Sequence, residues 1–313
     1  MKKIIVHIGR PKTGTSALQM FLLRNQSYLD HFDYVYLNYE NKVNSNFPFR
    51  RCSPSIYNKL DNKNKLLAIN EAKLFVEESI KNNKVAIISS ENISNFEKEV
   101  FNNIFDEYDV QIIAYVRNEI DFFASSYAQY IHANWVDLDF SDYLSDRRIH
   151  SSMNDSYLRK IATFKNKKII VRKYDKDALE HQDIREDFIV NVLGLDMDKT
   201  HFDFTSDMNS NPSLTDSVIE FKRELVRRSN KEFSDKKFYK PFAQLSEIYG
   251  SKYKFPMDQK NRILERLELI DTPVLSCYGL HYSMDEYKNY DFSSRVPKIN
   301  FKEMFGCLMN LSK

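Results

Sequence analysis

Four short runs of β-branched and other apolar residues recur along this chain, and longer polar or amphipathic stretches separate them. The runs cover residues 3–8, 85–88, 110–116 and 169–171, and each has the length of a fully buried strand. Strands that alternate with helical stretches of a dozen or more residues are typical of βαβ units, in which helices cover both faces of a parallel sheet. The pattern therefore predicts an α/β fold of three layers, with a central, mostly parallel sheet flanked by helices.

The alternation weakens beyond about residue 230, where aromatic and lysine-rich segments follow. This region contains one expected helix over 257–269 and a tail near Phe301. We expect residues 1–230 to form the core of the protein and residues 231–313 to form a helical or irregular extension packed on the same domain. The length of 313 residues agrees with one large domain or two modest ones.

Charge, hydropathy and cysteine content exclude several classes of protein. The 46 Lys and Arg residues nearly balance the 44 Asp and Glu residues, so nothing favours a nucleic-acid partner. No stretch approaches the roughly 18 apolar residues of a membrane-spanning helix, and residues 1–10 leave no room for a secretory apolar core of about 7 to 15 residues. Three scattered cysteines without CxxC spacing disfavour structural zinc or a disulfide framework. These features lead us to expect a cytoplasmic protein.

The loop after the first run is the most informative segment of the chain. Its sequence is HIGRPKTGTS, residues 7–16, and it contains two of the six glycines of the whole protein. A strand that leads through such a loop into a helix makes a phosphate-binding turn, because backbone N–H groups and the helix N-terminus both favour an anion there. An ordinary glycine-containing turn is the alternative, but a lysine and three hydroxyl residues share this loop, so we expect anion binding.

The same loop distinguishes two kinds of nucleotide chemistry. Gly9 and Gly14 have the spacing of a GxxxxGK[ST] motif, in which lysine directly follows the second glycine. Here Thr15 takes that position, and Lys12 precedes Gly14 by two residues. A kinase that transfers phosphate from ATP or GTP is therefore disfavoured, although it stays an alternative.

The segment resembles the 5′-phosphosulfate loop, PKxGT[ST], of sulfotransferases that use 3′-phosphoadenosine 5′-phosphosulfate (PAPS). The resemblance covers about residues 3–228. Within the family, the sequence is closer to the bacterial and carbohydrate-type members than to the steroid-type ones. It implies a fold of the P-loop type, with Lys12 at the bridging oxygen of the donor. It also implies that Thr13, Gly14, Thr15 and Ser16 bind the 5′-phosphate through main-chain and hydroxyl donors. Arg10 and Pro11 belong to the same donor-binding segment.

A second match lies after the third run. Arg117 follows residues 110–116, and Ser125 lies eight residues later on an expected helix. An arginine fork and a hydroxyl that converge on one dianion are sensible phosphate chemistry. The 3′-phosphate motif of the same family has this spacing, so the resemblance implies that Arg117 and Ser125 bind the 3′-phosphate. The structural alternative is that Arg117 pairs with Asp121 and that Ser125 is an ordinary helix residue.

Weaker similarities follow in the later part of the chain. Tyr174, at the end of the fourth run, would approach the adenine by resemblance, and a buried structural tyrosine is an equal alternative. Residues 209–213, Asn-Ser-Asn-Pro-Ser, are similar to an Asn-Pro-Ser segment of family members or are a plain turn. The family's C-terminal Arg-Lys-Gly segment has no counterpart here, and the substitutes that we consider are Arg223, Arg227 and Arg228.

Transfer of a sulfuryl group to a hydroxyl needs a base near the acceptor oxygen and positive charge at the leaving phosphate. Glu91 follows the second run, at the strand end where family members carry a catalytic histidine or an acidic motif, and is our first candidate for the base. The structural alternative is that Glu91 caps the following helix or pairs with a lysine of a loop. His7 and His132 are minor candidates.

These observations predict an enzyme that moves a sulfuryl group in line from PAPS to a hydroxyl and releases adenosine 3′,5′-bisphosphate. No metal is implied, because the loop, Lys12 and Arg117 supply the positive charge. We expect a saccharide acceptor, by analogy with carbohydrate-type members and because the 19 tyrosines of a polar chain suit stacking on sugar rings. A nucleotide-dependent kinase and a non-catalytic nucleotide-binding module are the alternatives.

Overall fold

A computed structural model gives the fold of most of the chain. It describes residues 2–10, 12–37, 61–80, 84–91, 93, 98–145, 154–164, 167–196, 201–205, 213–228, 233, 236–268, 273–292 and 299–312. The chain folds as two compact units. The first unit comprises Met1–Arg117, Asn154–Met208 and Pro273–Leu280, and the second comprises Asn118–Met153, Asn209–Thr272 and His281–Lys313. These units interleave along the sequence, so the division expected at residue 230 stays a prediction.

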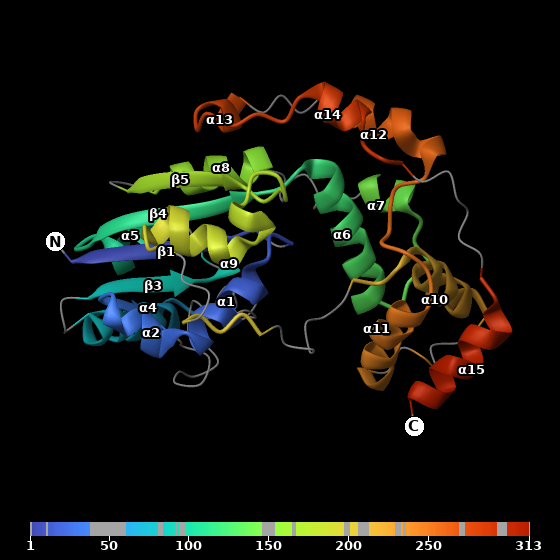
Figure 1. The fold of residues 1–313 in the computed structure, drawn as a ribbon, viewed down its shortest axis with the longest axis horizontal. Coiled ribbons are helices and arrows are strands. Elements are labelled where there is room, and N and C mark those ends of the chain that lie inside the picture. Colours follow the sequence, from blue (N-terminus) through green and yellow to red (C-terminus); the bar gives the residue numbers. More distant parts are fainter. Residues whose placement is uncertain are drawn as a thin grey trace. The chain divides into compact units, whose positions relative to one another are not determined.

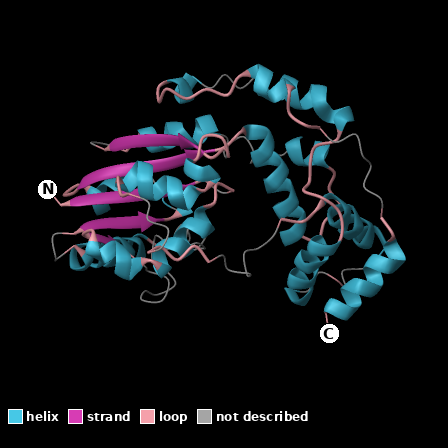
Figure 2. Ribbon diagram, in the orientation of Figure 1, coloured by secondary structure: helices cyan, strands magenta, loops and turns pink. Residues whose placement is uncertain are grey.

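A five-stranded parallel sheet forms the centre of the first unit (Figure 2). Its strands are β1 (Lys3–Gly9), β2 (Tyr34–Tyr36), β3 (Val85–Ser89), β4 (Asp109–Val116) and β5 (Lys168–Lys173), in the order β2-β3-β1-β4-β5. Every pairing between these strands is parallel. The α/β class and the four strands predicted from the apolar runs are confirmed. The three-residue strand β2 was not predicted, because it is too short to show a pattern.

Helices cover both faces of this sheet (Figure 1). Helices α1 and α9 and the π-helix η4 pack on one face, while α5 and α8 lie behind the sheet in the view of Figure 1. The helices of the first unit are α1 (Thr15–Arg24), α2 (Gln26–His31), α4 (Asn62–Ser79), α5 (Lys98–Phe105), α8 (Asn154–Ala162), η3 (Glu180–Gln182), α9 (Ile184–Asp187), η4 (Phe188–Leu193) and α13 (Pro273–Ser276).

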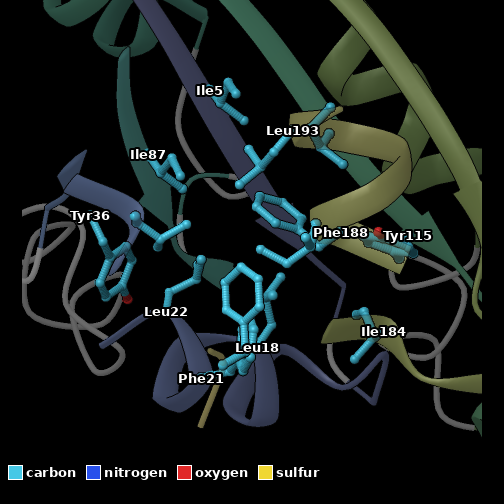
Figure 3. Packing of buried hydrophobic residues seen from close by; sticks show 14 of the residues in the cluster. Ile5, Leu18, Phe21, Leu22, Tyr36, Ile87, Tyr115, Ile184, Phe188 and Leu193 are labelled. Carbon is cyan, nitrogen blue, oxygen red and sulfur yellow. The ribbon is translucent and has the colours of Figure 1, made fainter. Parts of the chain in front are cut away.

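The core on the first face explains why α1 and η4 are held to the strands (Figure 3). Side chains two residues apart in a strand point to the same face, so Ile5 and His7 of β1 both point toward α1 and η4. Leu18 of α1 and Phe188 of η4 are fully buried in the same cluster as Ile5. Burial of a leucine or phenylalanine of this kind stabilises a fold by about 1.5–3 kcal/mol. The carboxyl end of β1 and the start of α1 are therefore anchored on both sides of the loop that joins them.

The second unit is helical in the part that the structure describes. Its elements are α6 (Glu119–Ala133), α7 (Phe140–Ser145), α10 (Asp216–Arg228), η5 (Lys236–Phe238), α11 (Tyr239–Ile248), η6 (Met257–Gln259), α12 (Lys260–Glu268), α14 (Met284–Lys288) and α15 (Phe301–Leu311). The helix expected over 257–269 is present as η6 followed by α12. Buried Lys222 of α10 donates to the main-chain carbonyls of Ile131 and His132, both at 2.7 Å, and so joins α10 to the end of α6.

Two further findings concern the described residues as a whole. Among the helices in that part of the chain, none combines the length and the apolar character that crossing a membrane requires. The same residues contain no group of three or more His, Cys, Asp or Glu side chains that could hold a metal ion.

Candidate functional site

The carboxyl ends of β1, β3, β4 and β5 lie at one edge of the first unit's sheet, because all four strands are parallel. The residues that directly follow these strands are Arg10, Ser90, Arg117 and Tyr174. The topology therefore brings the predicted residues of the first unit to the edge where ligands bind in open α/β sheets.

The loop after β1 has the backbone of a tight turn that leads into a helix. The φ angles of Lys12 and Gly14 are positive, 69° and 73°. Thr13 donates twice to the carbonyl of Arg10, from its hydroxyl at 2.7 Å and from its N–H at 3.3 Å. Helix α1 then begins with Gly14 as N-cap, without a side-chain cap and with no acidic residue in its first turn. Its N-terminal N–H groups are thus left to a ligand or to water, as in an anion site. Pro11 lies outside the described residues.

Gly9 and Thr15 are in close contact where β1 enters this loop. A Cβ atom at Gly9 would collide with the side chain of Thr15. The Thr15 hydroxyl is buried, and its Oγ1 has no hydrogen-bond partner. Buried polar atoms nearly always have a partner, so an orphaned hydroxyl in the first turn of α1 fits a site that an anion oxygen completes.

Gly14 and Tyr174 are in contact across the loop. A Cβ atom at Gly14 would lie 2.8 Å from a ring carbon of Tyr174, and the positive φ angle disfavours any larger residue there. The Tyr174 N–H donates to the carbonyl of Val116 at 2.6 Å, which fixes the tyrosine at the end of β5 beside β4. Burial raises the pKa of the Tyr174 phenol, while the charge of Arg117 acts in the opposite direction. The tyrosine is therefore a neutral ring that closes over the loop.

Arg117 joins the end of β4 to the loop after β1. Its Nη1 donates to the main-chain carbonyl of Lys12 at 3.0 Å. Its guanidinium carbon lies 5.7 Å from the centre of the Tyr174 ring, within the range of a cation–π interaction. The two segments that the motifs single out, more than a hundred residues apart in sequence, are therefore in direct contact through Arg117.

Arg10 and Asn154 form hydrogen bonds that connect the loop after β1 to the end of β4. Arg10 is fully buried, and its Nη1 donates to Asn154 Oδ1 and to the carbonyl of Arg117. Asn154, at the start of α8, donates in turn to the Arg117 carbonyl at 2.8 Å. Sequence reasoning missed Asn154, because an asparagine at a helix start is the usual sign of a cap and nothing nearby indicates an arginine partner. The Arg10 side chain holds the two loops together, and its predicted role in donor binding stays a prediction.

Ser125 lies on α6, as expected, and α6 belongs to the second unit. Its predicted pairing with Arg117 stays a prediction. The other candidate residues of the second unit make contacts inside that unit. His132 Nε2 bonds to the Tyr239 carbonyl at 2.9 Å, and its ring stacks on that tyrosine. Arg223 and Arg227 donate to Asp137, and Arg228 donates to Glu224. Residues 209–212 lie outside the described part of the chain.

Glu91 follows β3 in a short helical turn at the same sheet edge and is half-buried. Its charge and that of Arg10 act in opposite directions on the phenol of Tyr157, whose pKa burial raises. Tyr157 donates to the Ile8 carbonyl, one residue before the end of β1. Glu91 and Arg10 therefore both act on the phenol of Tyr157, which is itself bonded to β1 near the start of the loop.

His7 is fully buried in β1, one strand away from this acid. Its Nδ1 bonds to the Ser89 hydroxyl at 2.8 Å, and its Nε2 has no partner. Burial lowers the pKa of His7 to about 3. A histidine that stays neutral to such a low pH is a weak base, and the role of His7 as a catalytic base stays a prediction. Gln19 of α1 donates to the Ser89 carbonyl at 2.9 Å and adds a contact between α1 and the end of β3.

Comparison with known proteins gives distant similarities only. No protein-family model and no curated protein matches the chain. Among solved structures, a sulfotransferase from Alicyclobacillus acidocaldarius is similar at 18% identity and a TM-score of 0.40, over 67% of this chain and 87% of that chain. A chain from the PezAT chromosomal toxin–antitoxin system of Streptococcus pneumoniae is similar at 12% identity and a TM-score of 0.28, over 73% of this chain and 88% of that one.

Proposed function

We propose that this protein is a sulfotransferase that moves a sulfuryl group from PAPS to a hydroxyl of an acceptor and releases adenosine 3′,5′-bisphosphate. The observation that carries the proposal is the hydrogen bond from Arg117 to the carbonyl of Lys12 at 3.0 Å. It joins the two segments whose sequences resemble the two phosphate motifs of the PAPS-dependent family. One bis-phosphorylated nucleotide needs two phosphate sites on one protein, and a direct contact between the two segments supports that arrangement.

The residues of the loop suit the 5′-phosphate end of this donor. The uncapped N-terminus of α1 offers main-chain donors, and the orphaned Thr15 hydroxyl offers another. In the proposal Lys12, Thr13, Gly14 and Ser16 complete that end, and Lys12 stabilises the charge that grows on the leaving oxygen. Loss of one such donor typically lowers the rate by about 10²–10³. Tyr174 packs beside the loop and is proposed to contact the adenine.

Arg117 is proposed to bind the 3′-phosphate together with Ser125. An arginine fork matches phosphate geometry and keeps its charge throughout the physiological pH range. The Tyr174 ring beside the guanidinium and the Lys12 carbonyl position the side chain. The positive charge on Lys12 and Arg117 supplies what a metal ion provides in kinases, so the proposal includes no metal.

Glu91 is the proposed general base. The acceptor oxygen forms a bond to sulfur while the bond from sulfur to the bridging oxygen of the donor breaks, and the acceptor proton passes to the Glu91 carboxylate. Base catalysis of this kind contributes about 10²–10⁴ to a rate. His7, whose Nδ1 bonds to the Ser89 hydroxyl at the end of β3, is proposed to position the strand end that leads to Glu91.

A saccharide is the proposed acceptor class, as the resemblance to carbohydrate-type and bacterial members implies. The polar composition and the 19 tyrosines suit contacts with sugar rings. The cytoplasm is the proposed compartment, because three scattered cysteines fit a reducing environment.

The direct test is an activity assay with PAPS labelled in the sulfuryl group. The protein is incubated with a panel of glycans, simple phenols and steroids, and a parallel sample receives ATP and Mg²⁺. We expect label on one or more glycans, and no turnover of ATP in the parallel sample. Label confined to phenols or steroids would reject the saccharide class, and ATP turnover without sulfuryl transfer would reject the enzyme proposed here. Donor binding without turnover, unchanged in Glu91→Ala, would instead indicate a non-catalytic binding module.

A further inference from the structure

A small pocket lies within the second unit, and the proposed sulfuryl transfer makes no use of it. Its volume is about 90 Å³. Residues from four parts of the unit line it, including Tyr127 of α6, Glu220 and Arg223 of α10, Tyr253 before η6, and Gln259 at the end of η6. Pockets for drug-sized ligands have about 300–1,000 Å³. The pocket of the second unit is smaller than these, so it suits a small molecule or one chemical group of a larger molecule.

One side of the pocket is aromatic. The ring centres of Tyr127 and Tyr253 are 5.1 Å apart, and Phe140 lies 5.5 Å from Tyr127. Burial raises the pKa of both tyrosines, so their phenols stay neutral at physiological pH. The Tyr127 hydroxyl already donates to the Leu138 carbonyl at 2.9 Å. The rings therefore form an apolar surface, and the hydroxyl groups at their edges are uncharged.

The other side of the pocket is polar. Arg223 is engaged within the protein, since it donates to Glu220 at 2.7 Å and to Asp137 at 3.0 Å. Lys254, which also lines the pocket, is paired with Asp291. The cations of the lining are thus held by carboxylates of the protein.

Gln259 is different from these groups. Its Oε1 is buried and has no hydrogen-bond partner, although the residue lines the pocket. A buried acceptor without a partner is rare, and each such case calls for an explanation. A ligand that donates a hydrogen bond into the pocket would satisfy this oxygen.

We propose that this pocket binds a neutral polyhydroxylated molecule, such as the edge of one pyranose ring. Sugar hydroxyls donate to amide and carboxylate oxygens, here Gln259 Oε1 and the carboxylates of Asp139 and Glu220 that line the pocket. The C–H face of a sugar ring packs on aromatic rings, here those of Tyr127 and Tyr253. All of the lining residues belong to the second unit and none belongs to the loop after β1, and the proposal stands whether or not the protein transfers sulfuryl groups.

The test is an NMR titration of the full chain with methyl α-glucoside, methyl α-galactoside and methyl N-acetyl-β-glucosaminide, with ethanolamine and glycerol as further probes. At least one glycoside is expected to bind and to shift signals of Tyr127 and Tyr253. Gln259→Met keeps the side-chain length and removes the acceptor oxygen, so the Kd for that glycoside should rise about tenfold. The matched control is Gln244→Met on α11, at a half-buried glutamine outside the pocket, which should leave the Kd unchanged.

Three outcomes would overturn the proposal. They are the absence of binding by all glycosides, binding of ethanolamine in their place, and glycoside binding that Gln259→Met leaves unchanged. A circular dichroism spectrum and an unfolding curve for each variant show whether the substitution has changed the fold. If Gln259→Met does not fold, Gln259→Leu, which removes the same acceptor oxygen, is used instead, with the same glycosides and the same expected direction. Binding of adenosine 3′,5′-bisphosphate, measured in the same samples, should not respond to Gln259→Met, which separates this site from the proposed function.

Discussion

The guanidinium of Arg117 donates to the main-chain carbonyl of Lys12 at 3.0 Å. This bond ties the residue after β4 to the turn after β1, and both strands end at the same sheet edge. Asn154, on a third element, α8, reinforces the junction because it accepts from the buried Arg10 and donates to the Arg117 carbonyl. Substitutions at and around this junction can be tested for their effect on the stability of the fold and for their effect on nucleotide binding.

Gly14 is expected to resist substitution for two separable reasons. Gly14→Ala places a Cβ in the left-handed region, which costs about 1–2 kcal/mol, and 2.8 Å from the Tyr174 ring, which adds about 1–3 kcal/mol of overpacking. Gly194→Ala is the matched control, because Gly194 has a φ of 70° and no heavy atom within 4 Å of the added Cβ. Urea unfolding should show a larger loss for Gly14→Ala than for Gly194→Ala. Equal losses would mean that Tyr174 does not close over the loop.

Buried His7 is expected to make the protein sensitive to acid. Its pKa is about 3 in the folded state and about 6.5 in an unfolded chain, so the unfolded state binds the proton first as the pH falls. Stability should therefore decrease from about pH 6.5 toward pH 3, and at pH 5 the loss from this residue is about 2 kcal/mol. The free energy of unfolding of wild type and His7→Asn, measured at pH 7.5 and 5.0, checks this. The same pH dependence in both proteins would contradict it.

Asp187, the last residue of α9, is expected to be sensitive to substitution because it is a buried acid with several hydrogen-bond partners. It is fully buried, accepts from Arg172 Nε at 2.7 Å and Nη2 at 2.6 Å, and accepts from the Tyr115 hydroxyl at 2.7 Å. Asp187→Asn removes the charge that Arg172 faces and should cost about 3 kcal/mol. Tyr115→Phe removes one bond and should cost about 1 kcal/mol. Denaturant unfolding measures both, and a larger loss for Tyr115→Phe would show that the ion pair is not the main contribution.

Much of the fold could be predicted from sequence, because buried parallel strands are apolar throughout and need only local pattern. The runs behind β1, β3, β4 and β5 were visible for this reason, whereas the three residues of β2 were too few to show a period. The loop after β1 stood out because it contains two of only six glycines.

The contacts between residues far apart in the sequence could not be predicted in the same way. The bond between Arg10 and Asn154 joins residues 144 positions apart, and local pattern carries no information about such a pair. The low pKa of His7 arises from burial against Tyr115 and Phe188, which come from other elements. Glu91 could be placed at the end of a strand because it follows an apolar run, but its electrostatic interaction with Tyr157 became evident only in the fold.

Glu91 is expected to matter for turnover and not for donor binding. Glu91→Gln keeps the shape of the side chain and removes the proposed base, so kcat for sulfuryl transfer should fall by about 10²–10⁴. Binding of adenosine 3′,5′-bisphosphate should stay as in wild type. Glu99→Gln, an exposed acid on α5, is the control and should leave both quantities unchanged. A kcat in Glu91→Gln that equals the wild-type value would remove Glu91 from the mechanism.

The most direct test of the central claim is calorimetric titration of adenosine 3′,5′-bisphosphate into wild type, Lys12→Ala and Arg117→Ala. Hydrogen bonds to charged groups contribute about 1.5–3 kcal/mol, so each substitution should weaken binding by about tenfold or more. Lys168→Ala, at the opposite end of β5, and Arg159→Ala, exposed on α8, are the charge-matched controls and should bind as wild type does. If Lys12→Ala and Arg117→Ala also bind as wild type does, the two joined segments do not form a nucleotide site and the protein is not the proposed sulfotransferase.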